Sequence, residues 1–286
     1  MDEEFLALLI YVDDVIVTGT SITAITSVKK ALHDKFTIKD LGPLKYFPGL
    51  EVARSDSGII VSQRKFILDL IQDTGLSNAK AVTSPLPIAL HLSPDTGDLL
   101  PNPNQYRRLV GRLLYVNLTR PDISYAVQHL SQFMSAPRMP HWIAALHVVK
   151  YLKSCPSKGL FFPVSNDIQL SAFCDTDWAS STFSRKSLTG YCVFFWGAFI
   201  YWKTKKQATV SKSSAEAEYR AMAATVCELL WITYVLRDLQ VSVMLPIPLY
   251  CDNKAALHIA SNPVFHERTK HLEIDCHNEI NYKRAL

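Results

Sequence analysis

Apolar residues at the start of the chain are arranged first as strands and then as a helix. Residues 5–18 contain two apolar runs on either side of Asp13 and Asp14, which predicts two buried strands joined by an acidic turn. Residues 21–35 carry apolar side chains at helical spacing and predict an amphipathic helix. The first part of the chain therefore combines a hairpin with a helix.

The next segments are shorter and are interrupted by proline. Gly42-Pro43 predicts a turn, residues 59–63 predict a strand, and Pro48 predicts a local distortion of the hairpin that contains it, because proline cannot donate to a strand ladder. Residues 84–104 hold five of the 15 prolines, which predicts a linker or an extended surface loop. Helical spacing then returns and predicts three helices at residues 105–117, 122–134 and 141–153.

The last part of the chain alternates strand and helix patterns, which predicts a mixed sheet with helices packed against it. Ser213 and Glu216 have the spacing of a capping box and predict the start of a long helix. The predicted elements are a strand ending near Asp175, strands at 188–196 and 198–204 joined at Gly197, a helix at 214–239, a parallel strand ending at Cys251, and a helix at 253–261.

Three acidic residues lie at the ends of these elements. Asp175 and Asp252 end apolar strands, and Glu218 lies in the first turns of the long helix. In an α/β sheet such positions converge at one edge, where ligands usually bind. Mg²⁺ prefers carboxylate oxygens, so we predict that Asp175, Glu218 and Asp252 bind Mg²⁺ or Mn²⁺.

Each acidic residue also has a structural interpretation. Asp175, or Asp177 beside it, can be a turn residue at a strand end, and Glu218 can interact with the helix dipole. Asp252 can be the N-cap of the helix that follows it. Asp13 and Asp14 can likewise be ordinary turn residues.

Composition excludes several classes of protein. With 286 residues, 48% hydrophobic and 20% charged, the chain has the composition of a globular protein and not of a disordered one. Its acidic N-terminus does not resemble a signal peptide, and its apolar runs are too short to span a membrane. The six cysteines form no C-x-x-C pair, which indicates reduced thiols. We predict a soluble intracellular protein.

Basic residues cluster close to the acidic residues in the sequence, although the net charge is only +4. A run of basic residues can hold the phosphates of a nucleic acid, and phosphate contacts require no base-reading motif. The predicted nucleic-acid-binding residues are Arg185, Lys186, Lys203, Lys205, Lys206 and Lys212.

Several motifs together resemble one family. Tyr-Val-Asp-Asp at 11–14 is similar to the palm signature of reverse transcriptases. Phe-Cys-Asp-Thr-Asp-Trp-Ala at 173–179, Ser-Ser-Ala-Glu-Ala-Glu-Tyr at 213–219 and Leu-Tyr-Cys-Asp-Asn-Lys-Ala-Ala at 249–256 resemble the ribonuclease H domain of copia-type LTR retrotransposon Pol polyproteins. The order Asp, Glu, Asp distinguishes this domain from transposases and proofreading exonucleases of related fold.

The resemblance implies an α/β (α+β) fold in three parts. It assigns 1–83 to a reverse transcriptase palm remnant, 84–163 to a helical thumb and connection, and 164–286 to a ribonuclease H-like domain with a mixed sheet. It also implies a polymerase-motif remnant at Asp13 and Asp14, and metal-dependent cleavage of RNA in RNA/DNA hybrids by Asp175, Glu218 and Asp252.

The chain departs from the family at both ends. The upstream palm strand and the fingers would lie before Met1, and the expected strand and helix with a fourth acidic residue would lie after Leu286. We therefore expect an inactive polymerase and a weak or lost ribonuclease H. The alternative is a non-catalytic transposon remnant that at most binds nucleic acid.

Two further sets of possible metal ligands lie near the C-terminus. His271, Glu273 or Asp275 could replace the fourth metal ligand, and the sequence does not choose among them. Zinc is not expected from the nearby histidines and cysteines, because their spacing matches no zinc finger. That set is Cys251, His266, His271, Cys276 and His277.

Overall fold

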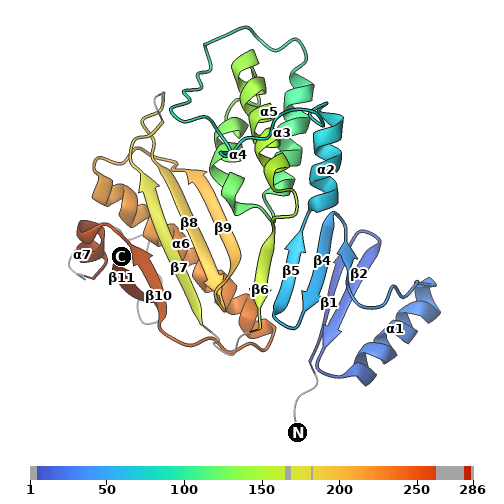
Figure 1. Cartoon of the computed structure of the whole chain (residues 1–286). Helices are drawn as coiled ribbons and strands as arrows, with labels where there is room; N and C mark the ends of the chain where they lie inside the picture. Colours follow the sequence, from blue (N-terminus) through green and yellow to red (C-terminus); the bar gives the residue numbers. More distant parts are fainter. Residues whose placement is uncertain (1–4, 165–168, 182, 262–279, 285–286) are drawn as a thin grey trace.

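The computed structural model describes residues 5–164, 169–181, 183–261 and 280–284, the last segment as backbone only (Figure 1). These residues form three sheets, of two, four and five strands, together with the helices that pack on them. The mixed α/β fold predicted from the sequence is confirmed. No helix in the described ranges is both long and apolar enough to cross a membrane.

The two-stranded sheet at the N-terminus is more exposed than predicted. β1 (Leu6–Tyr11) pairs antiparallel with β2 (Asp14–Gly19), and Tyr11 lies opposite Asp14. The turn is therefore Val12 and Asp13, with Val12 at a φ of 53°, rather than Asp13 and Asp14. The prediction of buried strands was wrong, because little of the described chain covers this hairpin: Ile10 is 67% exposed. α1 (Ile22–Phe36) follows, and Ser21 caps it by accepting from the Ala24 N–H.

A four-stranded antiparallel sheet joins distant parts of the chain. Its order is β3 (Tyr46–Phe47), β4 (Leu50–Ser55), β5 (Gly58–Ser62) and β6 (Leu160–Pro163). Pro48 and Gly49 form the turn between β3 and β4, so Pro48 ends a strand and does not distort one. Gly49 has a φ of +75°, which suits glycine, and a Cβ there would collide with the Tyr115 ring.

Four helices form the first hydrophobic core. They are α2 (Arg64–Asp73), α3 (Pro103–Val116), α4 (Ser124–Ser131) after the 3₁₀ turn η1 (Pro121–Ile123), and α5 (Met139–Ser154). α3, α4 and α5 match the three predicted helices to within a few residues, whereas α2 was not predicted. Residues 84–102 form an extended loop that Leu92 and Leu100 fix to this core, since both side chains are buried. α2 packs with helices that the sequence assigns to the next region, and the predicted domain boundaries stay a prediction.

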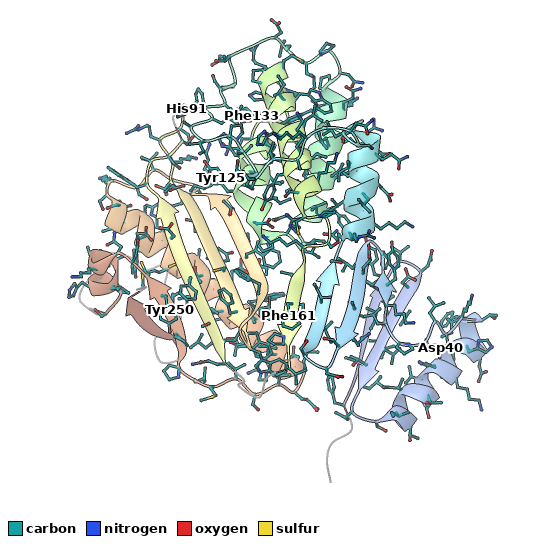
Figure 2. The ribbon with its side chains drawn as sticks, viewed as in Figure 1. Asp40, His91, Tyr125, Phe133, Phe161 and Tyr250 are labelled. Atoms are coloured by element: carbon teal, nitrogen blue, oxygen red, sulfur yellow. The ribbon has the colours of Figure 1, made fainter. Side chains whose placement is uncertain are left out.

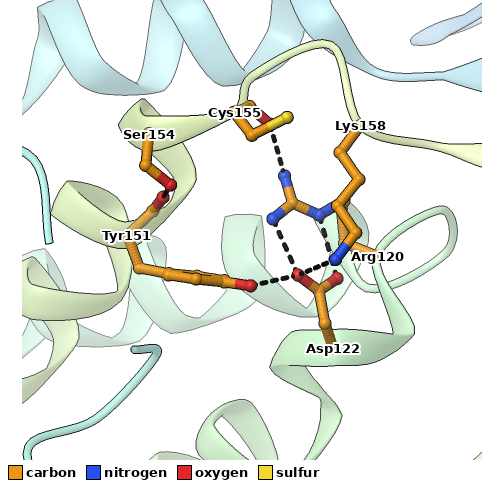
Figure 3. A network of polar contacts seen from close by, with 6 residues as sticks. All are labelled: Arg120, Asp122, Tyr151, Ser154, Cys155 and Lys158. Carbon is orange, nitrogen blue, oxygen red and sulfur yellow. Dashed lines mark hydrogen bonds and ion pairs between the residues drawn. The ribbon is translucent and has the colours of Figure 1, made fainter. Parts of the chain in front are cut away.

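A buried ion pair stabilises the end of this helical core (Figure 3). Arg120 is 1% exposed and donates from Nε and Nη2 to the two carboxylate oxygens of Asp122, at 2.9 and 2.8 Å. Its Nη1 donates to the Cys155 carbonyl, and the Tyr151 hydroxyl donates to Asp122. Lys158 is the outer partner of Asp122, at 3.3 Å. The network therefore ties η1 to the C-terminal end of α5.

The five-stranded sheet has the order β11-β10-β7-β8-β9. β7, β8 and β9 are antiparallel neighbours, β10 is parallel to β7, and β11 is parallel to β10. The strands are β7 (Leu170–Asp177), β8 (Leu188–Phe195), β9 (Ala198–Lys206), β10 (Ile247–Cys251) and β11 (Ile280–Arg284). This is the mixed sheet that the sequence predicts.

Two helices accompany this sheet, and one strand differs from expectation. α6 (Ser214–Asp238) crosses one face of the sheet and forms the second core with β7, β8 and β10, and α7 (Lys254–Ser261) follows β10 (Figure 1). The next strand was expected beyond the end of the chain. That expectation was wrong for the strand, since β11 pairs in parallel with β10.

Candidate metal centre

The two aspartates are brought together by neighbouring parallel strands. β7 and β10 pair through Ala172 with Leu249 and Phe173 with Tyr250, so both strands end at the same edge of the sheet. Asp175 is two residues beyond Phe173 on β7, and Asp252 is two residues beyond Tyr250. The register therefore places these two carboxylates side by side.

Glu218 reaches the same edge from the first turns of α6. Ser213 caps this helix by accepting from the Glu216 N–H at 3.1 Å. The reciprocal half of the predicted capping box is shifted by one residue, because Glu216 accepts from the Lys212 N–H and not from Ser213. Glu218 lies on the face of the helix that packs on the sheet, with Ala221 and Met222, and is only 5% exposed.

Short distances link the three carboxylates. The Thr176 N–H points at two of them: it is 2.8 Å from Asp175 Oδ1 and 3.1 Å from Glu218 Oε1. An oxygen of Glu218, an oxygen of Asp252 and the sulfur of Cys251 all lie within 4.8 Å of one another. The structure thus brings Asp175, Glu218 and Asp252 to one place, as the sequence predicts.

The surrounding structure argues against the purely structural roles that the sequence allows for these three acidic residues. The N-cap of α7 is Asn253, whose Oδ1 accepts from the Ala256 N–H at 3.0 Å, so Asp252 is free of that role. β7 continues to Asp177, so Asp175 is inside the strand and not in a turn. Glu218 is turned toward the strands and not toward solvent.

Burial and like charges raise the proton affinity of this cluster. Burial is the largest cause that raises the pKa of Glu218 to about 8, followed by the negative charges of Cys251, Asp175 and Asp252. The Thr176 N–H opposes this shift by donating to the ionised form. Without a cation, Glu218 therefore holds a proton near neutral pH, and a cation would compete with that proton.

The donor set fits a hard divalent cation. Mg²⁺ and Mn²⁺ are bound in proteins mainly by carboxylate oxygens and water. Glu218 and Asp252 offer oxygens at ligand spacing, and Asp175 adds a third carboxylate beside Glu218. A buried carboxylate that is crowded by other carboxylates gains most from a positive charge.

Two sulfur atoms at this site were not assigned a role from the sequence. Cys251 Sγ is 3.8 Å from Glu218 Oε2, and Cys174 lies beside Cys251 on the neighbouring strand. A signal was present, because a cysteine directly precedes each of the two aspartates. Strand alternation turns such cysteines toward the helix that carries Glu218.

The predicted basic residues divide between two surroundings. The β7–β8–β9 register sets Asp177 level with Leu188 and Lys206, so the end of β9 lies at the same edge as the carboxylates. Lys203 lies further along the strand and is already paired with Glu228 on α6, at 3.0 Å. Lys206 approaches His129 of α4.

The remaining basic residues are in the two loops at this edge. Arg185 and Lys186 are in the loop between β7 and β8, and Lys212 is exposed just before α6. The Trp178 Nε1–H donates to the Ser211 carbonyl and so holds the two loops together. Lys205, Lys206, Arg185, Lys186 and Lys212 are thus near the metal centre in the fold, and their role in binding stays a prediction.

A cavity of about 970 Å³ opens on the sheet face opposite α6. Asp175 and Asp252 line it at one end, and Phe173 and Tyr250 stack beside them with ring centroids 4.6 Å apart. Phe161 on β6 lines the other side (Figure 2). Asp175 and Asp252 are therefore accessible from a wide, largely apolar cavity.

The other predicted ligands are elsewhere. Asp13 and Asp14 lie in the exposed N-terminal hairpin, and among the described residues no further acidic, histidine or cysteine side chains gather with them. His271, Glu273 and Asp275, and the histidines and Cys276 of the rejected zinc set, lie outside the described residues.

The comparisons with known proteins agree with this architecture. Residues 2–88 match the family of reverse transcriptases (RNA-dependent DNA polymerases). The chain is 41% identical over 270 residues to the retrovirus-related Pol polyprotein from transposon RE2 of Arabidopsis thaliana, covering 94% of this chain and 18% of that protein. It is 34% identical over 287 residues to the corresponding polyprotein from transposon TNT 1-94 of Nicotiana tabacum, covering 96% of this chain and 21% of that protein.

A solved ribonuclease H1 isolated from compost is a more distant match. It shares 12% identity with this chain at a TM-score of 0.31, covering 41% of this chain and 84% of that one. The chain spans about a fifth of the length of the two polyproteins above. On the polyprotein matches and the reverse transcriptase match, the chain belongs to the Pol polyproteins of copia-type retrotransposons.

Proposed function

We propose that this part of the Pol polyprotein cleaves the RNA strand of RNA/DNA hybrids with the help of Mg²⁺ or Mn²⁺. The observation that carries the proposal is the position of Glu218, a buried carboxylate on α6 that meets Asp252 and Asp175 at the ends of two parallel strands. A structural sheet does not require three acids at this point, since Asn253 caps the next helix and, among the described residues, the Thr176 N–H is the backbone donor shared by Asp175 and Glu218.

Each residue has a distinct part in the proposal. Asp175, Glu218 and Asp252 hold the cation, which when bound neutralises negative charge at the scissile phosphate. Thr176 orients Asp175 and Glu218 through its N–H. Lys205, Lys206 and Lys212 are at the same edge and would contact phosphates of the nucleic acid on either side of the cleaved bond.

We expect the cleavage to be slow. Three carboxylates meet among the described residues, whereas the family is expected to use four. A site with one ligand fewer leaves part of the negative charge at the phosphate without compensation. Each tenfold loss in rate corresponds to about 1.4 kcal/mol of barrier, so a deficit of a few kcal/mol lowers the rate by roughly hundreds-fold.

The test is release of labelled RNA fragments from a hybrid by the purified chain in Mn²⁺. Asp252→Asn should abolish the release. Asp177→Asn is the matched control, because Asp177 is at the end of β7, two residues beyond Asp175, and is outside the group of ligands. It should retain most of the activity. Equal cleavage by the Asp252→Asn variant and the original chain would remove Asp252 from the mechanism. Binding of the hybrid without any cleavage would favour the non-catalytic alternative.

Polymerase activity is not expected from this chain. The exposed Asp13 and Asp14 have no third metal-binding side chain near them in the described part of the chain, and positioning two metal ions for nucleotide transfer requires several ligands. Primer extension on an RNA template measures this directly. Template-dependent incorporation above the level of an Asp13→Asn/Asp14→Asn double variant would contradict the expectation.

A further inference from the structure

Sulfur and oxygen meet at the base of the metal centre. Cys251 Sγ lies 3.8 Å from Glu218 Oε2, and with an oxygen of Asp252 the three atoms lie within 4.8 Å. Cys251 is fully buried and Glu218 is 5% exposed. The Cys251 sulfur and the Glu218 oxygen are therefore held inside the protein, and only the Asp252 oxygen is on an exposed residue.

A second thiol adjoins this group. The pairing of Tyr250 with Phe173 places Cys251 and Cys174 next to each other on β10 and β7. Both cysteines are free thiols, both are buried, and both belong to the core beneath α6. The buried side of the site thus offers two sulfurs and the Glu218 carboxylate, and the side that faces the cavity offers Asp175 and Asp252.

Such a mixed set of donors discriminates between metal ions. Mg²⁺ binds oxygen and has little affinity for thiolate, whereas Zn²⁺ and Cd²⁺ accept both cysteine sulfur and carboxylate oxygen. Zinc takes four ligands in a tetrahedron with bonds of about 2.0 to 2.3 Å, and the Cys251 and Glu218 atoms are already close to the spacing of two such ligands.

We propose that Cys251, Glu218 and Asp252 form a site for Zn²⁺, with Cys174, which is adjacent to Cys251 across the β7–β10 pair, as the fourth donor. This site shares Glu218 and Asp252 with the proposed Mg²⁺ site, so one ion excludes the other. On binding, the Cys251 thiol and the protonated Glu218 carboxyl each give up a proton to solvent, and no electron is transferred. Only the consequence for cleavage rests on the proposed function, because binding of Zn²⁺ can be measured by itself.

The primary test uses Cd²⁺, a Zn²⁺ substitute that gives an ultraviolet charge-transfer band when it binds thiolate. The full chain is titrated with Cd²⁺ alone while this band is followed, and the affinity for Mn²⁺ is measured by electron paramagnetic resonance. We expect a saturable band at one Cd²⁺ per chain. Cys251→Ser should abolish the band and lower the ratio of Cd²⁺ to Mn²⁺ affinity by roughly 100-fold. Loss of a residue that only hydrogen-bonds to a metal ligand already lowers metal affinity by about 10- to 100-fold.

Cys192→Ser is the matched control, because Cys192 is on β8 of the same sheet but outside this group. It should leave the band and the affinity ratio as they are in the original chain. A band that persists in Cys251→Ser, or that disappears in Cys192→Ser, would overturn the proposal.

A second measurement avoids substitution in case Cys251→Ser fails to fold. The original chain is alkylated with and without Zn²⁺ under mildly unfolding conditions, and peptides are quantified by mass spectrometry. Zn²⁺ should slow alkylation of Cys251 and Cys174 but not of the exposed Cys227. Equal protection of Cys227, or none of Cys251, would contradict the site.

Hybrid cleavage separates this inference from the proposed function. Zn²⁺ should inhibit Mn²⁺-dependent cleavage by the Cys192→Ser control as it does in the original chain, in parallel with the occupancy reported by the Cd²⁺ band. A Cd²⁺ band without any Mn²⁺-dependent cleavage would support the zinc site and reject the ribonuclease function. Cleavage that continues at full rate when the zinc site is saturated would overturn the shared use of Glu218 and Asp252.

Discussion

At the scale of single residues, Glu218 carries the largest electrostatic cost in the site. Its pKa is raised from an ordinary value of 4.5 to about 8, chiefly by burial. The folded protein therefore binds a proton more tightly than the unfolded chain does. Between these two pH values the unfolded chain releases that proton first, so the free energy of unfolding falls as pH rises from about 4.5 to 8.

We predict that Glu218→Gln removes this dependence. In EDTA, the variant should become more stable than the original chain at pH 8, by a few kcal/mol at most, since each pKa unit is about 1.4 kcal/mol. At pH 4 the difference should largely vanish. Urea unfolding at both pH values measures this. Glu216→Gln on the same helix is the control and should keep the fall with pH; a stability difference between Glu218→Gln and the original chain that does not grow with pH would contradict the assignment.

The candidate ligands could be found from the sequence because their elements have clear signals. Ser213 marked the start of the helix that carries Glu218, and apolar runs marked the strands that end at Asp175 and near Asp252. The part of Cys251 could not be found in the same way. Its proximity to Glu218 depends on the register of β10 against β7 and on how α6 packs, which are tertiary properties.

At the scale of elements, the Arg120 network determines how η1 and α5 stay together (Figure 3). Arg120 is almost fully buried, and its charge is balanced mainly by Asp122, whose own pKa is held well below its usual range by hydrogen bonds from Arg120 and Tyr151. Burial opposes this shift but is outweighed. A buried ion pair is costly to break because one partner keeps its charge without solvent.

We predict that Asp122→Ala lowers the free energy of unfolding by about 3 to 5 kcal/mol, since it leaves Arg120 buried and unpaired. Lys158→Ala is the matched control: its side chain is 51% exposed and bonds the same carboxylate, so it should cost at most about 1 kcal/mol. Chemical denaturation at neutral pH gives both values. Similar losses for the two variants would show that burial of Arg120 does not determine the cost.

Elements with strong local signals were predicted well, and those that depend on distant contacts were not. α6 begins where Ser213 predicts a helix start, and α3 begins at Pro103, two residues before the predicted start at Gln105. α2 is short and gains its stability by burying Ile67 and Leu70 against helices formed later in the chain. Exposure of β1 could not be predicted either, because an apolar run gives no information about what covers it.

At the scale of the whole molecule, the N-terminal hairpin exposes several apolar side chains to solvent. Leu8 and Ile10 on β1 and Val15, which pairs with Ile10 from β2, lie on one face of the hairpin and are 42%, 67% and 38% exposed. Contiguous apolar surface of this kind promotes association between proteins.

We predict that the isolated chain self-associates and that Ile10→Lys reduces this association. The charge would disrupt the apolar surface at a position where nothing in the described structure must be unpacked. Sedimentation over a range of concentrations measures the effect. Ile88→Lys is the control, because Ile88 is 96% exposed but alone on its loop. An equal effect of both substitutions would attribute the change to net charge.

The four-stranded sheet, finally, sets an order of events during synthesis. β5 ends at Ser62, but its partner β6 begins only at Leu160. At ribosomal rates of about 5 to 20 residues per second, the edge of β5 that pairs with β6 lacks its partner for roughly 5 to 20 s after β5 is synthesised. In that interval α2 to α5 can fold through local contacts, which form faster than distant pairings. We therefore expect the helical core of α2 to α5 to fold first and to position β6 beside β5. The four-stranded sheet would then be completed after the helical core, although most of its strands are synthesised earlier.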